Sequence, residues 1–209
     1  MKILIIDSGI GNIGSVKNML KKIGFDSTIL KDPDNSNKDF DLAILPGVGA
    51  FDEGIKRIRS LGWDKFLYEF RKNENKKILG ICLGMQLLCD GSEEGELKGL
   101  SLIPGQFKKF RFDDSSIKVP HMGWNFVEFL NSFLYKDEYM TIPPKFYFVH
   151  SYKYVHDEEK YVSGITDYGG NRFPSVIRNN NVIGVQFHPE KSHKFGMNLF
   201  KTLLKAENP

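Results

Sequence analysis

The hydrophobic pattern of the first ninety residues alternates between short apolar runs and longer amphipathic stretches. Continuous apolar runs are typical of parallel strands that are buried on both faces. Stretches with apolar residues three and four positions apart predict helices packed on such a sheet. The expected strands are residues 2–7, 25–30, 41–45 and 77–79, and the expected helices are residues 15–23, 51–60, 63–71 and 85 onward.

Beyond residue 91 the pattern changes to short runs rich in β-branched and aromatic residues. A polar, glycine-rich loop is expected at residues 91–99, and the three asparagines 179–181 predict a hairpin turn, because asparagine tolerates a positive φ. The pattern favours a mainly antiparallel extension beside the parallel sheet, closed by a helix at about 193–205. The expected strands are residues 100–103, 107–112, 126–129, 146–152, 161–166, 173–178 and 182–187.

Composition limits the function classes. The 209 residues suffice for one α/β domain, and no linker-like stretch divides residues 1–209. The net charge of +3, without a block of like charges, argues against nucleic-acid binding. The first apolar run stops at Asp7, and the longest one, at residues 78–89, is too short to cross a bilayer, so no signal peptide or membrane span is expected. The two cysteines, Cys82 and Cys89, cannot build a disulfide framework, which favours the reducing cytoplasm.

The segment Gly80-Ile81-Cys82-Leu83-Gly84 predicts a strand, a sharp turn and a helix, with a cysteine at the apex. This is the cysteine counterpart of a nucleophile elbow, in which glycines leave room beside a strained residue. The helix dipole would favour a thiolate, and the N–H of Leu83 would be free to face an oxyanion. A buried structural cysteine at a tight packing point explains the pentapeptide almost equally well.

Two more glycine-rich turns are expected at the same edge of the sheet as Cys82, because all three follow parallel strands. In residues 46–49 the glycines on both sides of Val48 would allow its N–H to turn toward an anion. Residues 9–14 form Gly-x-Gly-x-x-Gly between a strand and a helix, and Asp32 follows the next strand. This pattern leaves open a nicotinamide-dependent oxidoreductase as an alternative to a plain strand–helix turn.

A catalytic cysteine needs a base, and five histidines are available. His188 follows an apolar strand and precedes Pro189 and Glu190. The proline breaks the strand alternation, so Glu190 can turn back toward the imidazole and fix its tautomer. His121 and His150 are rivals on chemistry alone.

Residues 46–49, 80–86 and 186–191 together resemble the motifs of the class I (triad) glutamine amidotransferases. Residues 7–12, 121–125 and 147–152 narrow the resemblance to the glutaminase subunits of imidazole glycerol phosphate synthase. The resemblance runs from residue 2 to about residue 204 in the same motif order. It implies a three-layer, flavodoxin-like α/β fold with a central, mostly parallel sheet and an antiparallel extension.

The resemblance also implies a role for individual residues. Cys82 would be the nucleophile, His188 the base and Glu190 its orienter. Val48 and Leu83 would supply the oxyanion donors. The implied substrate-binding residues are Gly47, Gly49, Gln86, Ser151 and Tyr152, and the implied partner-facing residues are Asn12, Trp124, Tyr147 and Lys191.

The activity implied is hydrolysis of L-glutamine to glutamate and ammonia through a thioester, without a metal or an organic cofactor. The implied partner is a (β/α)₈-barrel cyclase in a heterodimer that serves histidine biosynthesis. A non-catalytic scaffold is the alternative from another class. Residues 191–197 depart from the expected pattern and look closer to paralogues that supply ammonia to a sugar amidotransferase in surface-glycan synthesis.

Overall fold

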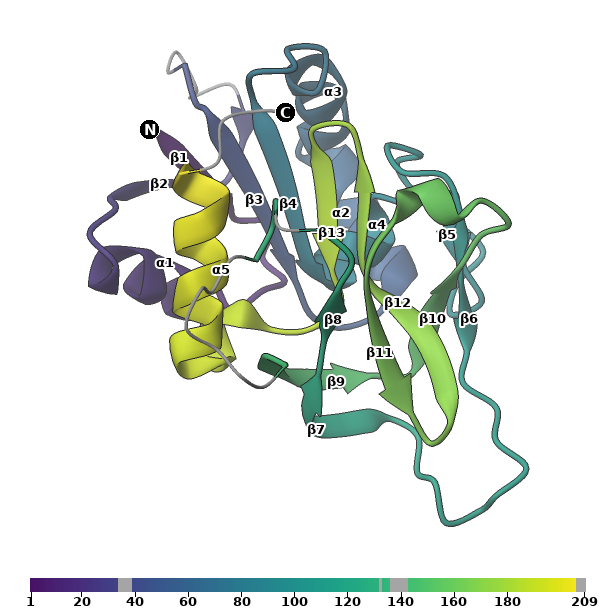
Figure 1. The fold of residues 1–209 in the computed structure, drawn as a ribbon. Helices are drawn as coiled ribbons and strands as arrows, with labels where there is room; N and C mark the ends of the chain where they lie inside the picture. The colour runs from purple at the N-terminus through teal and green to yellow at the C-terminus, as the bar shows by residue number, and fades with distance from the viewer. Residues whose placement is uncertain (34–38, 132, 136–142, 206–209) are drawn as a thin grey trace.

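The computed structural model describes residues 1–33, 39–131, 133–135 and 143–205. Its centre is an eight-stranded sheet in the order β2-β1-β3-β4-β13-β12-β11-β8 (Figure 1). The strands from β2 to β13 are parallel, and those from β12 onward are antiparallel. The strand bounds are β1 Ile3–Ile6, β2 Ser27–Leu30, β3 Leu42–Gly47, β4 Lys77–Cys82, β8 Glu128–Phe129, β11 Val162–Tyr168, β12 Asn171–Asn179 and β13 Val182–Val185.

This order confirms the predicted α/β fold, because the five parallel strands follow the doubly wound, flavodoxin-like arrangement. Every residue of β1, β3, β4 and β13 is buried, as the continuous apolar runs predict.

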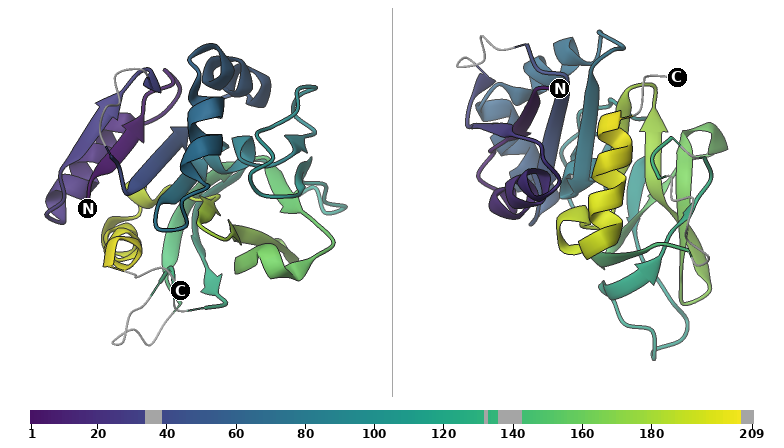
Figure 2. Two further views of the ribbon diagram at one scale, coloured as in Figure 1. Left: turned by 90° about the horizontal axis from the view of Figure 1, so that it is seen from above. Right: turned by 60° about the vertical axis from the view of Figure 1, so that its left-hand side comes forward.

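Helices cover both faces of the parallel strands (Figures 1 and 2). The helix α1 (Ile13–Lys22) contacts α5 (His193–Lys205) on one face, and α2 (Phe51–Ser60) contacts α3 (Trp63–Phe70) and α4 (Leu83–Leu87) on the other. Successive residues of a strand face opposite sides, so Ile3 and Ile5 join one core and Leu4 and Ile6 the other. The result is a helix–sheet–helix sandwich.

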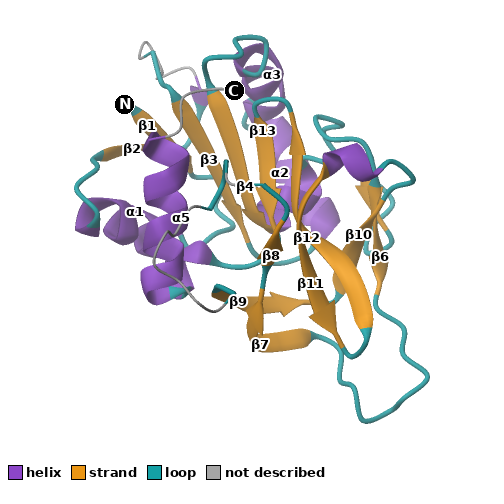
Figure 3. Ribbon diagram, in the orientation of Figure 1, coloured by secondary structure: helices purple, strands orange, loops and turns teal. Residues whose placement is uncertain are grey.

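The antiparallel extension adds two small sheets to one end of the sandwich, where Figure 3 shows strands and loops with few helices. One has the order β10-β6-β5, in which β10 is antiparallel and the short β5 parallel to β6, and the other pairs β7 with β9 antiparallel. The remaining bounds are β5 Gly91–Ser92, β6 Gln106–Lys109, β7 His121–Phe126, β9 Lys145–His150, β10 Tyr152–Val155, and the 3-10 turns η2 Glu159–Tyr161 and η3 Pro189–Lys191.

Among the details predicted beyond residue 91, the asparagine turn and the closing helix are confirmed, whereas the loop expected at 91–99 begins with the short strand β5. Asn180 takes a φ of 53° in the β12–β13 turn, and the closing helix spans His193–Lys205 as expected. Residues 100–103, however, form no strand. The backbone N–H of Leu100 donates to Leu87, and those of Leu102 and Ile103 donate to Leu88. The apolar run therefore satisfies the last carbonyls of α4, which a helix cannot satisfy by itself.

Candidate active site

Cys82 lies on a strained turn between β4 and α4, with φ 55° and ψ −109°. A Cβ atom on Gly84 would lie 1.9 Å from the carbonyl oxygen of Leu45, and one on Gly80 would lie 2.7 Å from the backbone of Gly84. Both flanking positions therefore require glycine, as the elbow interpretation predicts.

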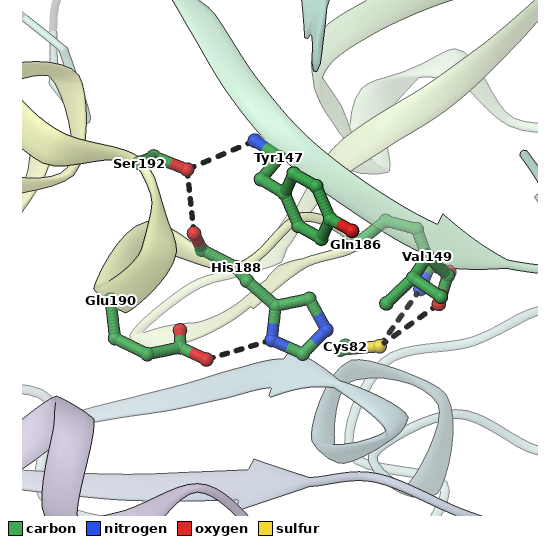
Figure 4. Close-up of polar contacts among 7 residues, drawn as sticks. All are labelled: Cys82, Tyr147, Val149, Gln186, His188, Glu190 and Ser192. Carbon is green, nitrogen blue, oxygen red and sulfur yellow. Dashed lines mark hydrogen bonds and ion pairs between the residues drawn. The ribbon is translucent and has the colours of Figure 1, made fainter. Parts of the chain in front are cut away.

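His188 and Glu190 form a buried pair beside the elbow (Figure 4). After β13, the turn η3 reverses the chain, so the Glu190 carboxylate comes back to the imidazole. Nδ1 of His188 lies 2.8 Å from Oε1 of Glu190, and the two side chains are 1% and 2% exposed. Because Nδ1 is bound to a carboxylate, Nε2 is the nitrogen left for chemistry.

The Nε2 side of the His188 ring faces the Cys82 sulfur, and no described residue hydrogen-bonds to that nitrogen otherwise (Figure 4). Burial lowers the pKa of His188, but its hydrogen bonds and charge interactions with Cys82 and Glu190 outweigh burial and raise the pKa to about 9. The imidazole is therefore protonated at neutral pH, poised to give a proton beside the thiol.

A second buried side chain, Gln186, touches the nucleophile. Its Nε2 donates to the Cys82 sulfur at 3.8 Å, and its Oε1 accepts from Nε2 of Gln86 at 3.5 Å. The carbonyl oxygen of Val149 lies 3.9 Å from the same sulfur (Figure 4). The amide of Gln86 thus fixes which end of Gln186 faces the thiol.

The elbow opens into a cavity of about 290 Å³. It is lined by eight of the predicted residues, namely Val48, Gly49, Cys82, Leu83, Gln86, Ser151, Tyr152 and His188. Gly47 does not line it, because this residue packs beneath the elbow, where a Cβ atom would lie 2.8 Å from the nitrogen of Gly84. Gly47 thus has a packing role beneath the elbow, and its predicted part in substrate binding stays a prediction.

The two expected oxyanion donors lie at this cavity. Leu83 begins α4, so its N–H has no partner within the helix. Val48 follows β3 and is 41% exposed. Gly49 takes a φ of 105°, a conformation that favours glycine, so the chain can turn sharply beside Val48.

Glu94 is a cavity residue that sequence reasoning missed. Its Oε2 accepts a hydrogen bond from the Phe51 N–H at 3.0 Å, and burial raises the pKa of its carboxyl. An acid in a polar loop carries no periodic signal. Gln186 was missed for a related reason, because an amide in a buried strand is normally explained by packing.

His121 and His150, the rival bases, form a neutral ladder. Nδ1 of His150 donates to the Tyr152 carbonyl at 2.7 Å, so Nε2 of His150 accepts from Nδ1 of His121 at 3.0 Å. Nε2 of His121 then accepts from Asn125 at 3.2 Å. Burial lowers the pKa of His121 to about 4 and that of His150 to about 3. With every ring nitrogen engaged, neither is placed to act as the base.

The glycines of residues 9–14 do not have the packing roles that a dinucleotide-binding fingerprint requires. In that fingerprint the third glycine allows close packing of helix on strand. Here α1 begins at Ile13, and a Cβ atom on Gly14 would meet nothing within 4 Å. Gly9 is held by a hydrogen bond from its N–H to Oδ1 of Asp7 at 3.0 Å. The segment is a strand–helix turn.

Three of the four predicted partner-facing residues form one surface cluster. Trp124 is 46% exposed, and its ring lies 6.3 Å from that of Tyr147 and 5.6 Å from that of His193. The Lys191 ammonium lies 5.8 Å from the centre of the Tyr147 ring. Asn12 immediately precedes α1, the helix that contacts the 3-10 turn η3 to which Lys191 belongs.

Two features are absent from the part of the chain that the structure describes, a metal-binding cluster and a membrane-spanning helix. There, no group of three or more histidine, cysteine, aspartate or glutamate side chains is placed to hold a metal ion. No helix among these residues has the length and apolar character to cross a membrane.

Comparison with known proteins defines the class first. Residues 4–206 match the family model described as "Glutamine amidotransferase class-I". The fold agrees, since the structure of PurLQS from Thermotoga maritima superimposes with a TM-score of 0.75 at 20% identity, covering 97% of each chain. A crystal structure of a glutamine amidotransferase gives a TM-score of 0.74 at 17% identity, with the same coverage. The chain is therefore a class-I glutamine amidotransferase.

Curated relatives then narrow the family. The chain is 47% identical over 203 residues to imidazole glycerol phosphate synthase subunit HisH 2 of Methanococcus maripaludis, covering 97% of this chain and 98% of the relative. It is 43% identical over 212 residues to subunit HisH of Sulfurimonas denitrificans, covering 99% of each. The chain belongs to the HisH family of class-I glutamine amidotransferases.

Proposed function

We propose that this protein is the glutaminase subunit of an imidazole glycerol phosphate synthase, hydrolysing L-glutamine to glutamate and ammonia at Cys82. The observation that carries the proposal is the arrangement around the elbow. A thiol at a positive φ faces the free nitrogen of a histidine whose other nitrogen is bound to a buried glutamate. The names of the HisH relatives support the pathway, and the nicotinamide, scaffold and sugar-amidation alternatives are not favoured.

The first half of the reaction forms a thioester. The Cys82 thiolate attacks the side-chain carbonyl carbon of glutamine, so a C–S bond forms and the carbonyl electrons move to oxygen. The N–H groups of Val48 and Leu83 stabilise this oxyanion. Protonated His188 gives its Nε2 proton to the amide nitrogen, the C–N bond breaks, and ammonia leaves.

The second half regenerates the enzyme. Neutral His188 takes a proton from a water molecule, which attacks the thioester carbonyl. The C–S bond then breaks, Cys82 leaves as the thiolate, and glutamate is released. Throughout, Glu190 holds the imidazole tautomer and stabilises its charged form.

The cavity also offers groups for the rest of the substrate. The Gln86 amide and the backbone at Ser151 and Tyr152 line the same space as the sulfur. The Glu94 carboxylate lies there too and is the acidic group suited to an α-ammonium group. We assign these residues to holding the amino-acid end of glutamine.

The expected partner is a (β/α)₈-barrel cyclase that consumes the ammonia in a cytoplasmic heterodimer. The relatives are named as subunits, which supports the existence of a second chain. We assign the partner surface to Asn12, Trp124, Tyr147 and Lys191.

The test mixes the chain with the cyclase of its own genome and measures glutamate release and imidazole glycerol phosphate formation. Cys82→Ala should abolish glutamate release, while the cyclase still works with added ammonia. Cys89→Ala is the matched control, because Cys89 is fully buried and burial raises its pKa well above the usual value. Glutamate release by Cys82→Ala would refute the role of Cys82 as nucleophile. The pathway is tested in a histidine auxotroph that lacks its own HisH subunit, with this chain and its cyclase co-expressed. Failure to restore growth without histidine would refute the pathway.

A further inference from the structure

The side chain of Ser192 is wedged between two backbones beside the active site. It follows η3 directly and is 0% exposed. Its Oγ donates to the His188 carbonyl at 2.6 Å and accepts from the Tyr147 N–H at 3.0 Å (Figure 4). Both partners of this hydroxyl are therefore main-chain groups, one of them on the residue that carries the candidate base.

These two bonds complete an interrupted strand pairing. Tyr147 and His188 form an isolated antiparallel bridge, and such a pair normally exchanges two N–H···O=C bonds. One of them is direct, from the His188 N–H to the Tyr147 carbonyl at 2.8 Å. The other is replaced by the Ser192 hydroxyl, which stands between the Tyr147 N–H and the His188 carbonyl.

We propose that Ser192 is a positioning residue for the base, and this inference rests on the proposed function. Its hydroxyl holds the backbone of His188 against β9, so the imidazole keeps its place between Glu190 and Cys82. Without the hydroxyl, the Tyr147 N–H regains an acceptor only if the His188 segment shifts and brings the His188 carbonyl into direct contact. A base displaced from its productive geometry slows proton transfer, while Gln86 and Glu94, which we assign to the amino-acid end of glutamine, keep their places.

The same contact connects the base to the partner surface. Tyr147 bonds to His188 through its backbone, and its ring lies within 6.3 Å of the Trp124 ring and 5.8 Å of the Lys191 ammonium. A partner that binds Trp124 and Tyr147 therefore contacts β9, the strand to which the backbone of His188 is hydrogen-bonded. Ser192 is one of only two hydrogen-bonded links in that bridge, so its loss should also reduce activation by the partner.

The test uses Ser192→Ala, with Ser163→Ala as the matched control, because Ser163 is a buried serine on β11. Glutaminase activity is measured with and without the cyclase. With the cyclase, we expect Ser192→Ala to lower kcat about tenfold with KM for glutamine within about twofold, and to reduce the activation factor. Ser163→Ala should match the unmodified protein. An unchanged kcat, or a change confined to KM, would overturn the proposal.

A second readout does not depend on activity. The His188 imidazole is titrated by NMR in the ¹⁵N-histidine-labelled chain, and its midpoint should move in Ser192→Ala but stay in Ser163→Ala. Should Ser192→Ala fail to fold, Ser192→Cys keeps the side-chain size with a weaker donor, and its kcat should fall below that of the unmodified protein. An unmoved midpoint, or full activity of Ser192→Cys, contradicts the role of Ser192. Absence of glutaminase activity in the unmodified complex contradicts the proposed function instead. In that case the His188 titration still shows whether Ser192 positions the imidazole.

Discussion

Gly84 is the residue on which the elbow most depends, because a Cβ atom there would overlap a backbone carbonyl of β3. Gly84→Ala must push α4 away from the sheet, and we expect it to lower the free energy of unfolding by about 3 kcal/mol or more. Gly14→Ala is the control, since open space surrounds that position within α1. It should stabilise the protein by up to about 1 kcal/mol. Urea unfolding of both variants checks this, and equal effects would contradict the packing argument.

The raised pKa of His188 has a consequence for stability. The folded-state pKa of about 9 exceeds the ordinary value of 6.5, so the folded protein holds this proton more tightly than the unfolded chain. The stabilisation is complete below pH 6.5 and is lost as the pH rises through 9. The difference in unfolding free energy between the unmodified protein and His188→Asn should therefore shrink by about 3 kcal/mol across this range. Urea titrations at pH 6.5, 7.5 and 9 measure it, and a constant difference would count against the imidazolium.

Among single residues, sequence reasoning located those that sit at chain reversals. Cys82 was found because glycines flank it, and the return of Glu190 toward His188 because a proline precedes the glutamate. Glu94 and Gln186 could not be found in this way. Their roles depend on distances across the fold, from Glu94 to the Phe51 N–H and from Gln186 to the Cys82 sulfur, and no local pattern encodes such distances.

At the scale of elements, the buried parallel strands and the amphipathic helices were predictable, because periodicity reports burial. The strands of the antiparallel extension were harder to predict from the sequence. Residues 121–125 belong to β7 but were not expected as a strand, since only His121 is buried and the apolar side chains of Met122 and Trp124 are exposed. Residues 100–103 were expected as a strand because they are apolar, yet they cap α4. An apolar run indicates that a segment is buried, but it does not indicate which backbone groups its N–H and C=O groups bond to.

The histidine ladder between β7 and β9 predicts sensitivity to acid. The folded-state pKa values of about 4 for His121 and about 3 for His150 lie below the ordinary value of 6.5. Between these values the two imidazoles are protonated in the unfolded chain but neutral in the folded protein. Stability is therefore lost as the pH falls from 6.5 toward 4, by on the order of 3 kcal/mol for each ring.

A double variant, His121→Asn with His150→Asn, isolates this effect. Its unfolding free energy should depend less steeply on pH between 6.5 and 4.5 than that of the unmodified protein. Parallel pH dependences in urea unfolding would show that the ladder does not carry the acid sensitivity.

At the scale of the whole molecule, the exposed Trp124 is the expected anchor for the partner. Exposed aromatic residues at the centre of an interface contribute most to affinity, so Trp124→Ala should weaken binding of the cyclase about tenfold while the melting temperature stays the same. Tyr68 on α3 is 55% exposed and serves as the control, and Tyr68→Ala should bind normally. Calorimetric titration measures both affinities, and equal affinities would refute the anchor.

The nucleophile and the base come from neighbouring strands that are far apart in the chain. β4 ends at Cys82 and pairs in parallel with β13, where Ile81 lies opposite Val185, just before His188. Contacts of such long sequence separation form slowly, because closing the long intervening loop costs entropy before the pairing stabilises it. During synthesis, the chain that has emerged with Cys82 alone therefore has a thiol but no base. Glutamine hydrolysis can begin only once the β13 strand has been translated and has paired, so unfinished chains release no ammonia.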